Sequence, residues 1–291
     1  MQIKKVGIIC SDTISDGLMM MCATHRLSSE GAFVITFNDK LHELTSWFPG
    51  YDFAKKLELE KLESSLEFFD LIILQYDGSL YAKNVIKMLT GKEKPALSVF
   101  YPTHTKYTHP PLTLYDRVFD SRLPTVDNVS LAISSLLQVR DHSKNNGLAA
   151  PSHLLHRRYK NRVAILASSR IRKKYEKIAD EVRKLGFDPI FVTEENISQG
   201  ASLIYESGYF IGPESDLCHL ASNLHIPTLV VSGKEPMSLS KPGWLKSSFI
   251  IFPRWLPQMV SERFVFVSKV ISGFKKMAIK PNSNPAYLAK D

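Results

Sequence analysis

The sequence predicts an α/β protein of two lobes, each with a parallel sheet covered on both faces by helices. Three observations lead to this prediction. Short, continuous apolar segments recur along the chain and alternate with segments of helical periodicity. A polar segment at about residues 140–160 interrupts this alternation, which then starts again. The length of 291 residues suits two domains of ordinary size.

In the first half, short apolar runs predict buried strands, and apolar residues three or four apart predict helices. The predicted strands are Val6–Cys10, Phe33–Phe37, Leu71–Leu74 and Ala96–Phe100. The predicted helices are Met19–Leu27, Tyr81–Leu89 and Val126–Val139. Residues 101–124 are rich in Pro, His and Thr and are expected to be irregular.

The second half repeats the pattern. The predicted strands are Val163–Ala167, Pro189–Val192, Tyr209–Ile211, Thr228–Val231 and Phe249–Ile251. The predicted helices are Tyr175–Leu185 with Gly186 as C-cap, a short helix near Leu203, a helix carrying His219, and Ser261–Phe274. We therefore expect a first lobe over residues 1–145, a linker over 146–160, a second lobe over 161–275 and a loose tail over 276–291.

The composition is that of a soluble globular protein, with 44% hydrophobic and 23% charged residues. No run approaches the roughly 18 apolar residues that span a bilayer, and the N-terminus lacks a cleavable apolar region. The three cysteines match no disulfide or zinc pattern. These features predict a cytoplasmic protein with buried, reduced cysteines. The net charge of +8 favours anionic partners such as a membrane surface or a phosphorylated substrate, whereas no nucleic-acid-binding motif is found.

The most informative segment is GYFIGPESDLCHLASNLHIPTLVVSG, residues 208–233. A strand followed by a small-residue turn and a helix presents free backbone N–H groups and the positive end of a helix dipole, which suit a phosphate. Such a turn also lies at the edge of an open sheet where ligands bind. The alternative is that Ser215 or Asp216 only caps the helix.

The loop after the first strand, CSDTISDG at residues 10–17, contains Asp12 and Asp16. It is neither a dinucleotide fingerprint nor a Walker loop. A carboxylate at the carboxyl edge of the sheet could act as general base on a hydroxyl nucleophile. The alternative is that Asp16 caps the following helix.

The segment ASSRIRKK at residues 167–174 follows the first strand of the second lobe. Its four cations could hold a diphosphate and stabilise its departure, although a basic run is more often a solvated face. Four histidines lie in loops at spacings that match no metal site: His104, His109, His153 and His156. No Asp-x-Asp pair is present, so we expect no metal and no cofactor.

Together these segments resemble the family 9 glycosyltransferases, the lipopolysaccharide heptosyltransferases. Residues 212–221, GPESDLCHLA, are similar to that family's Gly-x-Asp-Ser/Thr-Gly-x-x-His-Leu-Ala motif, and Ile226-Pro227-Thr228 continue it. Ser15-Asp16-Gly17 lie where the family has the loop that carries its catalytic Asp. Residues 126–131, VDNVSL, resemble its helix before the linker, and residues 167–174 resemble its Ser- and Lys-bearing donor loop.

The resemblance implies a GT-B fold with two Rossmann-like lobes facing a cleft. It implies inverting, metal-independent transfer from a nucleotide sugar such as ADP-heptose to a lipid-linked lipopolysaccharide glycan. Asp16 would be the base, with Asp12 and Ser15 on the acceptor side. The donor would contact the side chains or backbone of Ser169, Lys173 or Lys174, Glu214, Ser215, Asp216, Leu217 and His219. For His219, core packing is an equal alternative.

Two departures separate this chain from the family. Where the family has Asp-Ser/Thr-Gly, this chain has Glu214-Ser215-Asp216, so a carboxylate replaces the glycine beside the diphosphate. Ser15 replaces a glycine in the first loop. The alternative function is therefore a non-catalytic homologue that binds a glycan, a nucleotide or a protein. A sugar-nucleotide epimerase and a nucleic-acid-binding protein rank below it.

Overall fold

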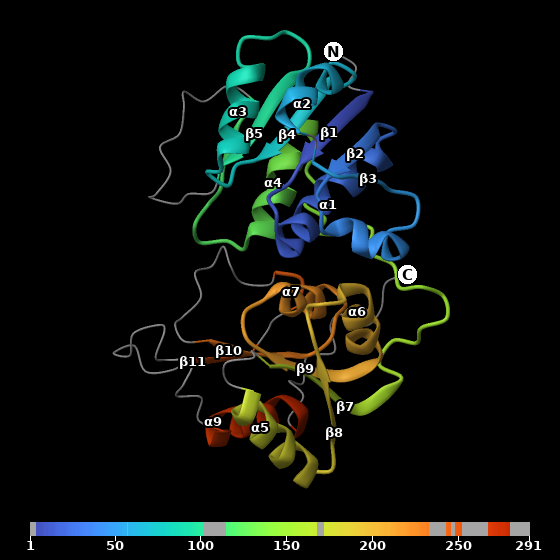
Figure 1. Ribbon diagram of the computed structural model, residues 1–291, viewed down its shortest axis with the longest axis vertical. Coiled ribbons are helices and arrows are strands. Elements are labelled where there is room, and N and C mark those ends of the chain that lie inside the picture. Colours follow the sequence, from blue (N-terminus) through green and yellow to red (C-terminus); the bar gives the residue numbers. More distant parts are fainter. Residues whose placement is uncertain are drawn as a thin grey trace. The chain divides into compact units, whose positions relative to one another are not determined.

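The computed structural model describes residues 4–56, 58–101, 115–167, 172–232, 243–245, 248–251 and 267–279. The chain divides into two compact units. Unit 1 comprises Met1–Ser152 and Pro236–Trp244, and unit 2 comprises His153–Glu235 and Leu245–Asp291. Each unit is built on its own parallel sheet (Figure 1).

Unit 1 contains a six-stranded sheet in the order β3-β2-β1-β4-β5-β6, and all of its strand pairs are parallel. The strands are β1 (Lys5–Ile9), β2 (Phe33–Phe37), β3 (Asp52–Ala54), β4 (Leu71–Gln75), β5 (Ala96–Tyr101) and β6 (Arg117–Val118). The strands β1 and β4 are almost entirely buried, as expected for a parallel sheet covered on both faces.

The helices of unit 1 cover both faces of this sheet. They are α1 (Ile14–Ser29), η1 (Leu41–Trp47), α2 (Leu59–Leu66), α3 (Leu80–Leu89) and α4 (Thr125–Leu137). Helices α1 and α4 share one apolar core, which includes Met20 and Val129. Helices α2 and α3 share the other, which includes Leu62 and Val85.

Unit 2 contains a five-stranded parallel sheet in the order β11-β10-β9-β7-β8. Its strands are β7 (Tyr159–Leu166), β8 (Asp188–Val192), β9 (Ser207–Gly212), β10 (Thr228–Ser232) and β11 (Ser248–Ile251). Helices α5 (Arg172–Lys184) and α9 (Val267–Ile279) pack together on one face, and α6 (Ile197–Glu206) and α7 (Asp216–Asn223) pack together on the other (Figure 1).

The predicted α/β class and nearly all predicted elements are confirmed. Helix α1 begins at Ile14 rather than near Met19, because Thr13 supplies an N-cap whose side chain accepts from the Asp16 amide. Gly186 has a φ of +85°, the left-handed conformation expected just beyond the end of α5. Residues 261–266 of the predicted final helix and the tail from 280 onward lie outside the described residues.

The three cysteines are free and buried, as predicted. Burial raises the pKa of the Cys10 and Cys22 thiols well above the ordinary value, and that of Cys218 to about 12. Among the described helices, none has the length and hydropathy needed to cross a bilayer.

Candidate functional site

The crevice of an open parallel sheet lies at the carboxyl ends of the strands, where the chain changes direction across the sheet. In unit 1 the chain runs from β1 outward to β2 and β3 and then crosses to β4 on the other side of β1. The switch point therefore lies between β1 and β4, whose ends are in register at Ile9 and Leu74. The loop that carries Asp12 and Asp16 follows β1, and Gln75 ends β4, so both lie at this point.

The Asp16 carboxylate is held by three side chains. Its Oδ2 accepts hydrogen bonds from the hydroxyls of Ser11 and of Thr13, the second at 2.8 Å. Its Oδ1 accepts from Nε2 of Gln75 at 2.9 Å. Thr13 also caps helix α1 by accepting from the Asp16 amide at 3.0 Å, so Thr13 rather than Asp16 is the cap. The side chain of Asp16 is half-buried and its orientation is fixed.

Asn38, the residue after β2, fixes the backbone of the same loop. Its Nδ2 donates to the carbonyls of Ser11 at 2.8 Å and Thr13 at 3.2 Å. Its Oδ1 accepts from two successive backbone amides at the start of η1, both at 2.9 Å. A buried amide with both ends satisfied is a rigid support. The first loop is thus held from β2 on one side and from β4 on the other.

Asp12 has a different role in the same loop. Its Oδ1 lies 2.6 Å from Nζ of Lys56, whose side chain is only 11% exposed, whereas that of Asp12 is 73% exposed. The same ammonium lies 5.4 Å from the centre of the Tyr81 ring. Burial, together with the charges of Asp39 and Asp12, raises the pKa of Tyr81 to about 12. Ser15 is half-buried, with its hydroxyl 3.1 Å from that of Thr13.

The second predicted site lies at the switch point of the other sheet. In unit 2 the chain runs from β7 to β8 on one side and then crosses to β9 on the other, so the switch point lies between β7 and β9. The turn 213–215 leads from β9 into α7 at this point. Ser215 is the N-cap of α7, and its Oγ accepts from the Cys218 amide at 3.3 Å. Ser215 is therefore the residue that caps α7.

The residues of this turn and of the start of α7 differ in their exposure to solvent. Glu214 is exposed, and Ser215 and Asp216 are half-buried. The side chains of Leu217 and His219 are buried, so any contact of Leu217 with a ligand would be made by its backbone. The Glu214 carboxylate also contributes to the raised pKa of Cys218, after burial. Two carboxylates therefore accompany the amide groups of the first turn of α7.

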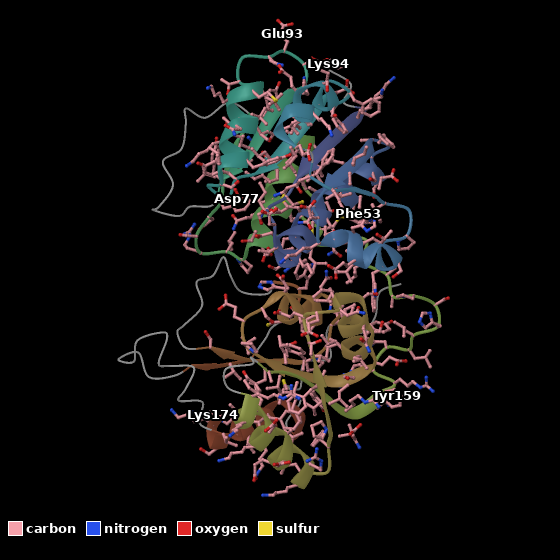
Figure 2. The ribbon with its side chains drawn as sticks, in the orientation of Figure 1. Phe53, Asp77, Glu93, Lys94, Tyr159 and Lys174 are labelled. Atoms are coloured by element: carbon pink, nitrogen blue, oxygen red, sulfur yellow. The ribbon has the colours of Figure 1, made fainter. Side chains whose placement is uncertain are left out.

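The basic segment after β7 is described only in part. Lys173 is exposed, and Lys174, which is labelled in Figure 2, is half-buried; both belong to the first turn of α5. Because α5 follows β7, these lysines belong to the connection at the same switch point as the 213–215 turn. Ser169 lies outside the described residues.

The described part of the chain contains no group of three or more His, Cys, Asp or Glu side chains that could hold a metal ion. His153 is exposed, and the ring of His156 is hydrogen-bonded to the carbonyl of Leu224 at 3.2 Å. His104 and His109 are not among the described residues.

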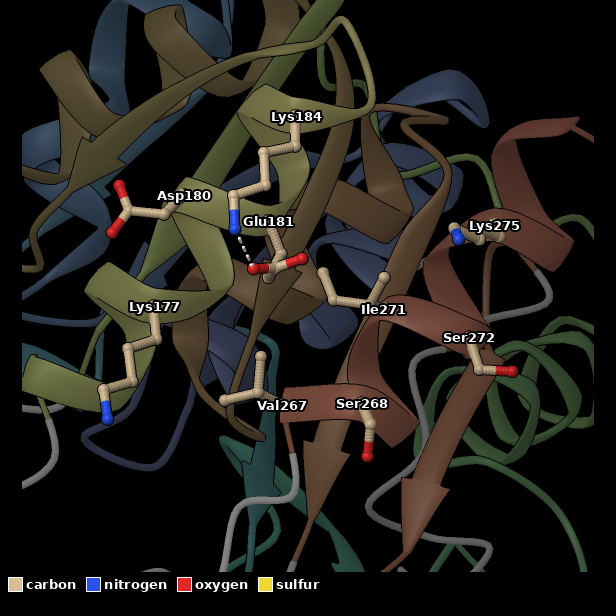
Figure 3. A pocket seen from close by; sticks show the side chains of 9 residues that line it. All are labelled: Lys177, Asp180, Glu181, Lys184, Val267, Ser268, Ile271, Ser272 and Lys275. Carbon is tan, nitrogen blue, oxygen red and sulfur yellow. Dashed lines mark hydrogen bonds and ion pairs between the residues drawn. The ribbon is translucent and has the colours of Figure 1, made fainter.

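A hollow of about 620 Å³ lies between α5 and α9 of unit 2 (Figure 3). Its apolar lining comes from Val267 and Ile271 of α9. The polar lining residues are Lys177, Asp180, Glu181, Lys184, Ser268, Ser272 and Lys275. The ammonium of Lys184 is 2.6 Å from the Glu181 carboxylate. None of the predicted site residues lines this hollow.

No protein-family model matches the sequence, and no curated protein matches it. Solved structures do match. The E. coli ADP-heptose lipopolysaccharide heptosyltransferase II is 14% identical, with a TM-score of 0.66 over 94% of this chain and 98% of that one. The E. coli heptosyltransferase WaaC with ADP-2-deoxy-2-fluoro heptose is 11% identical, with a TM-score of 0.67 over 94% and 99%.

A family 9 glycosyltransferase from Veillonella parvula is 13% identical, with a TM-score of 0.63 over 95% of this chain and 97% of that one. This chain has the heptosyltransferase fold. The predicted GT-B architecture of two Rossmann-like lobes is thus confirmed across nearly the whole chain. At 11–14% identity the likeness concerns the fold, and the substrate and the chemistry have to be argued from the residues.

Four residues of the first site were not among the predicted site residues: Ser11, Thr13, Asn38 and Gln75. Ser11 and Thr13 lie in the predicted loop itself. Asn38 and Gln75 had a weaker signal, which is a polar residue at the end of an apolar strand. A polar residue at the end of a strand can be assigned to a site only when the strand order is known.

Proposed function

We propose that the protein is a glycosyltransferase that moves a sugar from a nucleotide-sugar donor to a glycan acceptor. The observation that carries the proposal is the Asp16 carboxylate, which three donors hold at the switch point of the first sheet. A fixed and partly exposed carboxylate at that position is suited to accept a proton from a substrate hydroxyl. The heptosyltransferase fold supports the same class of reaction.

In the proposed reaction, the acceptor hydroxyl oxygen attacks the anomeric carbon of the donor sugar. A new glycosidic C–O bond forms as the bond from that carbon to the phosphate oxygen breaks, and its electron pair leaves with the nucleoside diphosphate. Asp16 takes the proton of the hydroxyl. Because one displacement occurs at the anomeric carbon, the configuration is inverted.

The donor is proposed to bind at the turn before α7 and the start of α5. The backbone of Leu217 and the Ser215 cap would present the helix N-terminus to the diphosphate, with Glu214 near donor hydroxyls and His219 behind the turn. Lys173 or Lys174 would neutralise the leaving diphosphate without a metal, and Ser169 would contact the donor. A structure of WaaC was solved with ADP-2-deoxy-2-fluoro heptose, which supports an ADP-heptose-like donor. The similarity to an ADP-heptose lipopolysaccharide heptosyltransferase supports a lipopolysaccharide-type acceptor.

A peripheral contact with an anionic membrane surface is part of this proposal, and the charges of α5 and α9 support it. The three acidic residues of α5 each have a basic partner on the same helix: Arg172–Glu176 at 3.3 Å, Arg183–Asp180 at 2.8 Å and Lys184–Glu181 at 2.6 Å. Helix α9 contains three lysines and no acidic residue. Exposed lysines in excess attract anionic lipid headgroups. The protein would then act at the cytoplasmic face of the inner membrane.

A second function is favoured by one observation, the carboxylates of Glu214 in the turn before α7 and of Asp216 at the first position of α7. Like charges about 4 Å apart repel by on the order of 1 to 4 kcal/mol across plausible dielectrics, which corresponds to a loss of donor affinity between about fivefold and nearly 1,000-fold. A homologue that binds a glycan, a nucleotide or a protein without transfer would tolerate these residues.

The test is a screen of ADP-, UDP- and GDP-sugars, with and without a chelator, in which nucleoside diphosphate release is measured. We expect wild type to release nucleotide from at least one donor in the presence of EDTA, and Asp16→Asn to release far less. Equal release by both proteins would remove Asp16 from the mechanism. Absence of donor binding by calorimetry would favour the non-catalytic homologue.

A further inference from the structure

Gln75 is the buried polar end of an otherwise apolar strand. Strand β4 reads LIILQ, and Gln75 is 8% exposed as a whole residue. A buried amide is costly unless its donors and acceptor have partners. Gln75 satisfies both ends in one place, because Nε2 donates to Oδ1 of Asp16 at 2.9 Å and Oε1 accepts from the Ser11 backbone amide at 3.2 Å.

The chemistry of these partners determines which way the amide faces. A backbone N–H only donates, so it must meet the oxygen of the Gln75 amide. An ionised carboxylate only accepts, so it must meet the nitrogen. The reversed amide would place oxygen against oxygen and nitrogen against N–H. One side chain therefore ties the Asp16 carboxylate to the backbone of the loop that precedes it.

The two oxygens of Asp16 differ in what they accept. Among the described residues, Oδ2 accepts from the hydroxyls of Ser11 and Thr13, whereas Oδ1 accepts only from Gln75. Each carboxylate oxygen has room for about two hydrogen bonds. Oδ1 therefore retains one acceptor position, and Gln75 determines the direction of that position.

We infer that Gln75 is a positioning residue, which aims the open lone pair of Asp16 Oδ1 at the hydroxyl of the sugar acceptor. This inference rests on the proposed glycosyl transfer. Displacement of a reacting group by about 1 Å can lower a rate by on the order of 100-fold. Loss of Gln75 should therefore lower kcat and leave donor binding, which belongs to the other unit, unchanged.

The test compares three variants in the nucleotide-release assay with the full chain. Gln75→Leu keeps the size of the side chain and removes both hydrogen bonds. Gln75→Glu keeps the acceptor for the Ser11 amide and can donate to Asp16 only when it is protonated. Thr24→Val is the control, because it removes a buried hydrogen bond to Thr36 of 2.7 Å in the same unit without contacting the loop.

We expect Gln75→Leu to lower kcat about 10- to 100-fold with the donor KM within about twofold, and Thr24→Val to retain near-wild-type kcat. The activity of Gln75→Glu, relative to wild type at the same pH, should rise as the pH falls from 8 to 5.5, because the protonated carboxyl can donate to Asp16. A purely structural role would not produce that recovery.

The outcomes separate the inference from the function on which it rests. Wild-type kcat in Gln75→Leu, a loss equal to that of Thr24→Val, or no recovery of Gln75→Glu at low pH would overturn the role of Gln75 alone. If wild type itself releases no nucleotide from any donor, the proposed transfer is overturned and the inference with it.

Discussion

The ammonium of Lys56 lies 2.6 Å from the Asp12 carboxylate, so the two carboxylates of the first loop have separate partners. Asp12 is paired with a cation, whereas the partners of the Asp16 carboxylate in the described part of the chain are neutral hydroxyl and amide donors. The two aspartates are four residues apart in the sequence, but their carboxylates have different partners. Oδ1 of Asp12 is occupied by the Lys56 ammonium, whereas Oδ1 of Asp16 accepts from Gln75 and has room for one more hydrogen bond.

The first prediction follows from this difference. Asp16→Asn should lower nucleotide release by about 100-fold or more, within the usual contribution of a general base. Asp12→Asn should lower it by less than about tenfold, because Asp12 is not the proton acceptor. The measurement is kcat for the two variants with the same donor and acceptor. A larger loss for Asp12→Asn would exchange the roles of the two residues.

The second prediction concerns the first residue of α7. Asp216→Gly removes the carboxylate at the position where the family that this sequence resembles has glycine. Donor affinity should rise by about tenfold as the repulsion from the diphosphate disappears. Titration calorimetry with the nucleoside diphosphate measures the change. Asp188→Asn, at the opposite end of the sheet in β8, is the matched control and should leave the affinity unchanged.

An unchanged affinity in Asp216→Gly would mean that this side chain does not face the phosphates. The variant also removes an acidic residue from the first turn of α7, where it favours the helix by a few tenths of a kcal/mol. The melting temperature should therefore be recorded beside the affinity.

The third prediction concerns the basic helices of unit 2. Lys177, Lys275 and Lys276 are exposed, and none of them belongs to the proposed donor site. Replacing all three by Gln should weaken binding to vesicles that contain phosphatidylglycerol by about tenfold or more, since each lysine near an anionic surface contributes roughly 1 kcal/mol. Co-sedimentation at two salt concentrations measures the binding.

The control variant replaces three exposed lysines of unit 1, Lys40, Lys83 and Lys87. Equal losses in both triple variants would indicate that net charge alone drives the binding. If wild type does not bind the vesicles at all, the proposed membrane contact is wrong.

The fourth prediction concerns acid stability. Asp70 accepts from the backbone amides of Lys4 and Lys5, both at 3.0 Å, and its carboxylate lies 2.9 Å from Nζ of Lys94. The hydrogen bond from Lys94, followed by those from the two amides, lowers the pKa of Asp70 to about 2. A carboxyl whose pKa is lower in the folded state stabilises above its unfolded pKa, and this stabilisation is lost as the pH falls through the folded value.

Asp70→Asn should therefore lower the free energy of unfolding by about 1 kcal/mol at pH 7, and by progressively less between pH 4 and pH 2. Urea unfolding at pH 7, 4 and 3 measures the difference between the two proteins. Glu195→Gln, an exposed carboxylate in unit 2, should change little at any of these pH values. A constant difference across the series would contradict the assignment to Asp70.

Much of this architecture could be predicted because buried parallel strands are continuous apolar runs. The segments at residues 33–37 and 71–74 were recognised in this way, with ends within one residue. Strand β3 (Asp52–Ala54) and helix α2 (Leu59–Leu66) were not predicted. The first is three residues long and is not buried, and the second has too few turns to establish a period.

The candidate site could be predicted only in part, for a physical reason. Asp16 and Ser215 were recognised because local motifs surround them. The contact of Gln75 with Asp16 joins positions 59 residues apart and depends on β4 lying beside β1, an order that no local pattern contains. Thr13 could not be predicted as the N-cap for a different reason, because several residues of that loop are equally good caps.

The buried thiols make the molecule convenient for spectroscopy. All three native cysteines lie inside apolar cores and resist ionisation, so sulfhydryl reagents should leave them unmodified in the folded protein. A thiol introduced at an exposed position, for instance by Lys83→Cys, would then be the single reactive sulfur. A fluorophore attached there could report ligand binding without prior removal of any native cysteine.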